Sequence, residues 1–265
     1  MHKSLVVIAL GLGATFLLPG SGAADVFGRD RTVRGSGHIV SETRDVSGFD
    51  RIDLAGSCDL EISVGKDYKV TVVGDDNLIE FIRTEVSGSG TLHIESERSY
   101  STRRGIRIEI SMPHLTDLEI TGSGDAELSG LKEDELEINI TGSGDVQLAG
   151  EVHDLDIDIR GSGDVDVYDL QAETVRVSSS GSGDVELEGH ADMLEIVQRG
   201  SGDVDARRLE AISADAELYG SGDLAVRAKE SFDGSVFGSG DIDLYGNPPR
   251  LNRRVMGSGD INHRR

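Results

Sequence analysis

The sequence has little of several residue types, and each shortage argues against a class of protein. Cys58 is the only cysteine, so neither an intramolecular disulfide nor a cysteine-based zinc site can form. Tryptophan is absent and aromatic residues make up 4% of the chain, which is a poor composition for a cleft that stacks on sugar rings. Lys and Arg number 26 against 49 Asp and Glu, for a formal net charge of −23. Such an acidic chain argues against nucleic-acid binding and against docking on anionic lipid.

Long apolar runs are also scarce, and the one that occurs lies at the start of the sequence. Ser4 to Leu18 follows Lys3 and precedes the small residues Ser21 to Ala24, which is the composition of a cleavable secretory signal. The run is shorter than the ~20 residues of a membrane-spanning helix. We therefore expect residues 1–24 to be a signal peptide. The mature chain would then have no membrane span and would be extracytoplasmic, either periplasmic or secreted to the cell surface.

Glycine is abundant by contrast, at 35 residues, and much of it lies in a repeated tetrapeptide. Gly-Ser-Gly-Asp occurs eight times at intervals of 18 to 20 residues, with copies that begin at Gly122, Gly142, Gly161, Gly181, Gly200, Gly220, Gly238 and Gly257. A fixed period near 20 residues is the sequence signature of a solenoid. Degenerate copies begin at Gly35, Gly56 and Ser87.

The residues that flank each tetrapeptide alternate between apolar and polar. The fourth residue after the first glycine is apolar in every copy, namely Ala126, Val146, Val165, Val185, Val204, Leu224, Ile242 and Ile261. Leu155 to Ile159 shows the same alternation before the next copy. Period-2 alternation of Val, Ile and Leu predicts strands with one buried face. Because a single coil cannot bury that face alone, we expect an all-β, right-handed parallel β-helix of ~20-residue coils.

The tetrapeptide itself suggests how the coils turn. Two glycines around a serine indicate a backbone that bends there or that packs too closely for a Cβ. The aspartate has outward parity, so its carboxylate can accept a backbone N–H and fix the bend.

The two ends of the chain are less regular. We divide the mature chain into an N-terminal capping region, residues 25–112, and the repeat solenoid, residues 113–265. Phe49 to Val64 flanks the Gly56 copy and predicts a first coil. Apolar residues at helical spacing after Asp75-Asp76-Asn77 predict one short helix near residues 76–83, capped by Asp or Asn. Arg253 and His263 occupy inward positions of the last coil, which either blunts an exposed edge or marks a frayed terminus.

These motifs together resemble a known family. Val46 to Ile52, then Asp75 to Leu78, then serial Gly-Ser-Gly-Asp repeats are the combination found in the auto-transporter adhesin head domain, or GIN domain, formerly a domain of unknown function. The resemblance covers roughly residues 40–262. It implies a parallel β-helix in bacterial envelope or secreted proteins, and it implies no catalytic residues.

The repeated aspartates are the candidate metal-binding residues. An acidic file lies two residues further on, at Glu127, Asp166, Glu186, Asp205 and Asp243, interrupted by Gln147, Ala225 and Asn262. Unit charges ~4.8 Å apart repel by about 0.9 kcal/mol even in water, so backbone N–H groups or calcium should relieve the repulsion. The candidate calcium ligands are Asp145, Asp164, Asp184, Asp203 and Asp223. A purely structural turn role is the alternative, and no other cofactor is expected.

Three functions remain open. The first is a non-catalytic adhesin-like module that binds a cell-surface protein or a polysaccharide. The second is a β-helix polysaccharide lyase or hydrolase, which an outer groove with converging Asp and Arg or Lys would favour. The third is a calcium-stabilised structural rod. We predict no enzyme activity, because the acids are spread evenly and the histidines and serines show no catalytic spacing. Cys58 is expected to be a small buried residue rather than a reactive thiol.

Overall fold

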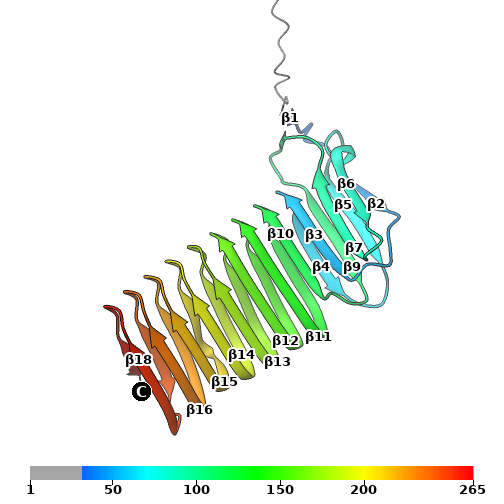
Figure 1. The fold of residues 1–265 in the computed structure, drawn as a ribbon. Helices are drawn as coiled ribbons and strands as arrows, with labels where there is room; N and C mark the ends of the chain where they lie inside the picture. The colour runs from blue at the N-terminus through cyan, green and yellow to red at the C-terminus, as the bar shows by residue number, and fades with distance from the viewer. Residues whose placement is uncertain (1–31, 265) are drawn as a thin grey trace, which may run out of the picture. The chain divides into compact units, whose positions relative to one another are not determined.

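The computed structural model describes residues 32–264 (Figure 1). The predicted signal peptide, residues 1–24, lies outside the described residues. The strands of the N-terminal part are β1 (Val33–Arg34), β2 (Ile39–Arg44), β3 (Arg51–Gly56), β4 (Asp59–Val64), β5 (Lys69–Asp75), β6 (Ile82–Val86), β7 (Thr91–Ser96), β8 (Tyr100–Ser101) and β9 (Arg107–Met112). In the described part of the chain, no helix is long and apolar enough to cross a membrane.

The repeat region consists of long strands that each follow most of one coil, with shorter strands at its two ends. They are β10 (Asp117–Gly122), β11 (Ala126–Gly142), β12 (Val146–Gly161), β13 (Val165–Ser179), β14 (Val185–Gln198), β15 (Val204–Leu218), β16 (Leu224–Val236), β17 (Ile242–Gly246), β18 (Arg250–Val255) and β19 (Ile261–Arg264). Each strand from β10 to β15 pairs in parallel with the next one, β16 pairs with β17 and β18, and β17 pairs with β19. The strands lie side by side from green to red in Figure 1. The chain is therefore a parallel β-solenoid, as predicted.

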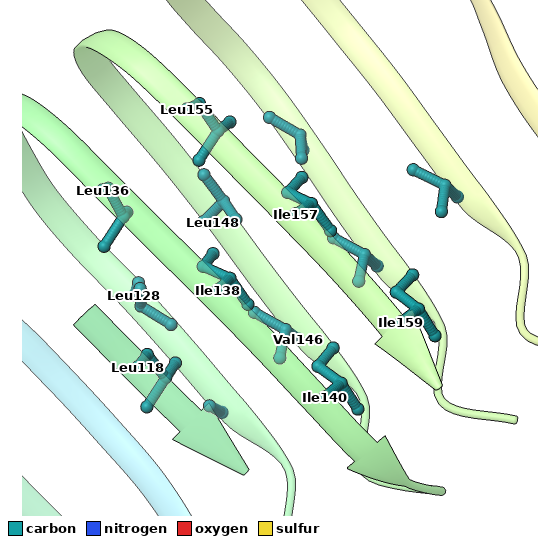
Figure 2. Close-up of a cluster of buried hydrophobic side chains, with 14 of the residues drawn as sticks. Leu118, Leu128, Leu136, Ile138, Ile140, Val146, Leu148, Leu155, Ile157 and Ile159 are labelled. Atoms are coloured by element: carbon teal, nitrogen blue, oxygen red, sulfur yellow. The ribbon is translucent and has the colours of Figure 1, made fainter. Parts of the chain in front are cut away.

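Inward side chains of successive coils form continuous apolar ladders. One ladder runs in register through Val146, Val165, Val185, Val204 and Leu224, all of them buried. Figure 2 shows another set, in which Ile138 and Ile140 align with Ile157 and Ile159 of the next coil. Burying one such side chain stabilises the fold by about 1.5–3 kcal/mol, so the stacked core holds coils that could not fold singly.

The glycines of the tetrapeptide are required by contact between coils. A Cβ on Gly161 would lie 1.9 Å from the carbonyl oxygen of Gly142, and a Cβ on Gly163 would lie 2.1 Å from that of Gly144. The same clash recurs at the corresponding glycines of the other copies. Of the two sequence interpretations, close packing is therefore confirmed as the general reason.

The N-terminal coils do not stack in the order of the sequence. The coil of β3 and β4, which was predicted as a first coil, supports β10 and β11 on one side. On its other side it pairs in parallel with β7 and β9, which come later in the chain. Beyond these, β5 and β6 pair antiparallel with β9 and β7, and β2 pairs antiparallel with β5. This reversal of strand direction ends the parallel stack.

The helix predicted near residues 76–83 is only a single 3-10 turn, η1 (Ile79–Phe81). Leu78 occupies the N-cap position and no side chain caps the turn, so the predicted Asp or Asn cap was wrong. The reason is that these polar side chains bond elsewhere. Asn77 Oδ1 accepts the N–H of Ser36 at 2.9 Å, and the Asp75 carboxylate accepts the N–H of Gly37 and the hydroxyl of Thr102.

Candidate functional site

The tetrapeptide aspartates stand one above another on the outside of the coils. We call them the aspartate ladder, which comprises Asp125, Asp145, Asp164, Asp184, Asp203, Asp223, Asp241 and Asp260. In each coil from Asp125 to Asp241, the carboxylate Oδ1 accepts the backbone N–H of the next ladder aspartate at 2.7–3.0 Å. The carboxylates therefore join neighbouring coils.

This bonding corrects one detail of the sequence interpretation. The aspartate was expected to accept an N–H inside its own turn, whereas the donor belongs to the following coil. The backbone strengthens the same junction, because the N–H of Val146 donates to the carbonyl of Asp164 at 2.9 Å. A negative carboxylate that accepts an N–H is stabilised in its charged form, which offsets the repulsion along the ladder.

The ladder includes the five candidate calcium ligands Asp145, Asp164, Asp184, Asp203 and Asp223. Each commits one carboxylate oxygen to a coil-to-coil bond. Among residues 32–264, no group of three or more His, Cys, Asp or Glu side chains is arranged to hold a metal ion. Calcium takes 6–8 oxygen ligands, so an ion on this ladder would need most of them from water or from a partner. Calcium binding here stays a prediction.

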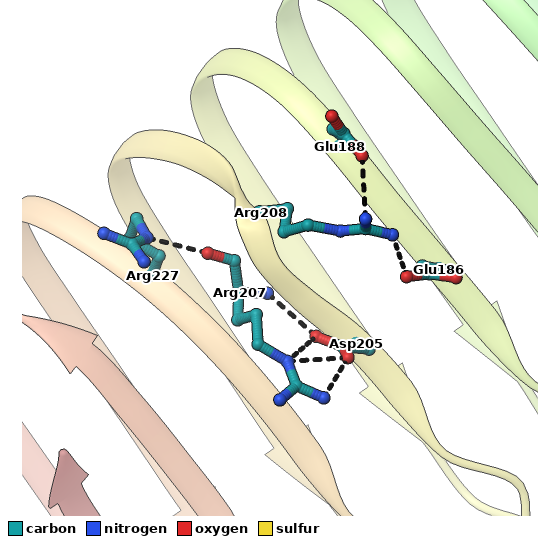
Figure 3. A network of polar contacts seen from close by, with 6 residues as sticks. All are labelled: Glu186, Glu188, Asp205, Arg207, Arg208 and Arg227. Carbon is teal, nitrogen blue, oxygen red and sulfur yellow. Dashed lines mark hydrogen bonds and ion pairs between the residues drawn. The ribbon is translucent and has the colours of Figure 1, made fainter.

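The acidic file predicted two residues further on is present and in register. It runs through Glu127, Gln147, Asp166, Glu186, Asp205, Ala225, Asp243 and Asn262. Figure 3 shows Arg208 reaching back to the preceding coil, where it pairs with Glu186 and with Glu188 at 3.2 Å. Together the aspartate ladder and the acidic file form what we call the acidic face.

Charges along the acidic file are not equally compensated. Partial burial, together with the nearby Glu186 and Asp164, raises the pKa of Asp166. The pKa of Asp205 is lowered, because the Arg207 guanidinium donates hydrogen bonds to its carboxylate (Figure 3). The same face therefore holds Asp166, whose carboxylate accepts only the Gln147 amide among the described residues, and, two coils away, Asp205, whose carboxylate is paired with an arginine.

The acidic face is hollowed where Ala225 interrupts the file. A groove of about 290 Å³ opens there, lined by Asp205 on one side and Asp243 on the other. Arg207 and Arg264 also line it, and they pair with Asp205 and Asp243 respectively. This is a place where aspartates and arginines converge, the feature set out above as favouring an enzyme.

Sequence reasoning missed a second acidic file on the strands that precede the tetrapeptide. It runs in register through Asp117, Glu137, Asp156, Arg176, Glu195, Asp215, Asp233 and Asn252. Arg176 bridges Asp156 at 3.2 Å and Glu195 at 3.3 Å, so one guanidinium joins three coils. The signal for this file in the sequence is the position five residues before each tetrapeptide, which is acidic in six of the eight copies.

Cys58 is buried, as predicted, and burial raises the pKa of its thiol. It stands where later copies have the second glycine. A side chain fits here because the coil beneath has no tetrapeptide turn, and Tyr100 lies there instead with its hydroxyl 3.5 Å from Cys58 Sγ. Cys58 therefore contributes to the packing between these coils.

The sequence matches one family model, described as "Putative auto-transporter adhesin, head GIN domain", over residues 48–167 and 150–248. A comparison with curated proteins finds no match.

Several solved structures are similar along most of the chain. A "Putative lipid binding protein" from Parabacteroides distasonis is 30% identical with a TM-score of 0.80, and the match covers 89% of this chain and 100% of that one. A "putative adhesin" from Bacteroides fragilis is 26% identical with a TM-score of 0.69, covering 88% of this chain and 100% of the other. A "putative adhesin" from Parabacteroides distasonis, 24% identical with a TM-score of 0.82 and the same coverage, shares the fold.

Proposed function

The chain belongs to the auto-transporter adhesin head (GIN) domain family, and from that premise we propose that it is a non-catalytic, extracytoplasmic binding module. The observation that carries the proposal is the regularity of the aspartate ladder within the acidic face. The aspartate ladder repeats the same group and the same bond from coil to coil, at the ~4.8 Å spacing of paired strands. A periodic partner would meet equivalent groups at every step.

The net charge of the chain limits which classes of partner the acidic face can bind. With a net charge of −23, the chain repels acidic polymers, so the acidic face suits a neutral or cationic polysaccharide or a basic surface of a cell-surface protein. We further propose that residues 1–24 are removed as a signal peptide. The mass of the exported chain tests this, since it should correspond to a protein that begins after Ala24.

A binding screen tests the proposed function. The mature chain is offered to arrays of cell-surface glycans and proteins, and to lipid vesicles because one relative is described as lipid binding. The expected result is a ligand whose binding is lost in Asp166→Lys, in the acidic file, and kept in Glu137→Lys, in the second acidic file. Equal loss in both variants, or no binding to any glycan or protein, would contradict the proposal.

The groove over Ala225 is where the alternative, a polysaccharide lyase or hydrolase, would act. Asp205 and Asp243 belong to coils two steps apart, about 9.6 Å along the stack, near the upper end of the separation in inverting glycosidases. A general acid needs a raised pKa, however, and Arg207 lowers that of Asp205. Release of reducing ends from a polysaccharide, abolished in Asp205→Asn, would establish the enzyme and overturn the binding proposal.

A further inference from the structure

The N-terminal region contains a cavity that the acidic face does not share. It has a volume of about 670 Å³ and is bounded by β1, the segment from Gly35 to Ile39, and the segment from Ser101 to Arg104. That volume is within the range of sites that hold small molecules. The degenerate Gly35-Ser36-Gly37 copy, which takes no part in the coil stack, forms one wall.

The walls of this cavity are fixed by a buried anchor. Asp75 is 2% exposed, and its carboxylate accepts the N–H of Gly37 and the hydroxyl of Thr102, each at 2.5 Å. Gly35 donates its N–H to the Ser101 carbonyl at 2.9 Å, and a Cβ on Gly35 would collide with Asp75. The two segments are therefore held in place without using the arginine side chains beside them.

Positive charge gathers in the cavity although the chain is strongly acidic. Arg34, Arg103 and Arg104 line it, and among the described residues none of the three forms an ion pair with a carboxylate. Ser36 and Ser101 belong to the same lining, and the Ser36 hydroxyl donates to Asp76 and accepts the N–H of His38. Two carboxylates lie at the cavity and both already have partners. Both oxygens of Asp75 accept hydrogen bonds, and Asp76 accepts the hydroxyl of Ser36 at 2.6 Å.

Guanidinium groups with nearby hydroxyls recognise tetrahedral oxyanions through paired N–H donors. The cavity is too large for a lone phosphate, and its lining has a single apolar side chain, Ile39, which offers little to an acyl chain. We propose that this cavity, the arginine pocket, binds a sugar phosphate, with the phosphate on Arg34, Arg103 and Arg104 and the sugar against Ser101 and Ser36. The proposal does not rest on the function proposed for the acidic face.

Calorimetric titration of the mature chain tests the arginine pocket. Glucose 1-phosphate should bind, inorganic phosphate should bind more weakly, and glucose should not bind. Arg103→Ala/Arg104→Ala should weaken glucose 1-phosphate binding at least tenfold. The matched control is Arg253→Ala/Arg254→Ala, which removes two adjacent exposed arginines from the last coil and should leave the affinity unchanged.

Further measurements distinguish a loss of binding from a loss of folding, and a sugar phosphate from a lipid headgroup. Thermal melts show whether each variant folds, and Arg34→Gln is a second pocket variant, because the fold uses the Arg34 backbone carbonyl as an acceptor for Asn77 and not its side chain. Vesicles of phosphatidylglycerol distinguish a lipid headgroup from a sugar phosphate. Binding to vesicles without binding to glucose 1-phosphate, equal affinity for glucose, or equal loss in the control would overturn the proposal.

Discussion

Single inward residues decide whether coils can stack. Val185 is buried within an apolar ladder, while Glu186 points outward and pairs with Arg208. Val185→Asp should be severely destabilising, because it buries an unpaired charge. Glu186→Lys should cost less than about 1 kcal/mol, the usual range for an exposed ion pair. Thermal melts of both variants check this, and comparable losses would contradict the assigned facing.

The glycine columns give a sharper residue-scale test. Gly161→Ala should destabilise by about 3 kcal/mol or more, because its Cβ would overlap the Gly142 carbonyl and force two coils apart. Gly88→Ala is the matched control, since no atom lies within 4 Å of its added Cβ. Urea unfolding of the two variants measures the difference. A near-neutral Gly161→Ala would show that the coils separate more readily than the stacking implies.

One inner ladder contains two polar residues where its neighbours are apolar. Ser179 and Gln198 stack between Ile159 and Leu218, and both are fully buried. Within the described chain, Ser179 Oγ has no hydrogen-bond partner. Ser179→Val should therefore raise the unfolding free energy by about 1 kcal/mol, because it replaces an unsatisfied hydroxyl with apolar surface. Denaturant melts that show a loss instead would indicate that the hydroxyl is bonded in solution.

At the scale of strands, two residues of the acidic file, Asp166 and Asp205, should change the stability of the fold with pH in opposite directions. The raised pKa of Asp166 means that its charged form destabilises the fold at neutral pH, and the penalty disappears as the pH falls through the folded pKa. The lowered pKa of Asp205 means that it stabilises the fold above its unfolded pKa of about 3.9, and this is lost as the pH falls through the lower folded value.

Asp166→Asn should therefore raise the melting temperature at pH 7. The gain should fade as the pH falls through the raised folded pKa and be absent below the unfolded value of about 3.9, where the carboxyl is protonated in both states. Asp205→Asn should lower the melting temperature at pH 7, because it breaks the contact with Arg207. Each effect should stay below about 1 kcal/mol, since both groups are partly exposed. Melting curves across pH 3–8 measure both shifts, and shifts of the same sign would refute the assignment.

The last coil illustrates how an edge strand is protected. β18 and β19 are regular strands, which argues against the frayed terminus, and all residues of β18 are exposed. Arg253 has inward register opposite Gly234 but is exposed, and its guanidinium donates to the carbonyl of Ile261 at 3.4 Å. Arg250 and Arg254 lie on the same strand. β18 pairs with β16 on one edge and has no partner on its other edge among the described residues, so positive charge there discourages the pairing of further chains.

At the scale of the whole molecule, calcium would act on the aspartate ladder as a linked ligand. If it binds the folded chain, millimolar calcium should raise the melting temperature more than magnesium does, because calcium accepts irregular oxygen sites. Sodium chloride at matched ionic strength controls for screening of the −23 charge. Equal shifts with calcium and sodium would mean that the ladder is purely structural, its carboxylates serving only the coil-to-coil bonds.

The sequence by itself determined the solenoid, its inner ladders and the acidic file. A period near 20 residues places equivalent side chains one above another, and two-residue alternation decides which of them face inward. Val165, Val185 and Asp166 could therefore be assigned from spacing alone, and the glycines could be linked to close backbone contact.

Only the tertiary structure decided what depends on contacts between distant segments. It placed β7 and β9 beneath β3 and β4, reduced the expected helix to η1 and gave each ladder carboxylate its donor in the next coil. It also brought Arg34 and Arg103 to one cavity. Outside the repeat, no period fixes which segments meet, because nonlocal strand pairing and side-chain hydrogen bonds override local pattern.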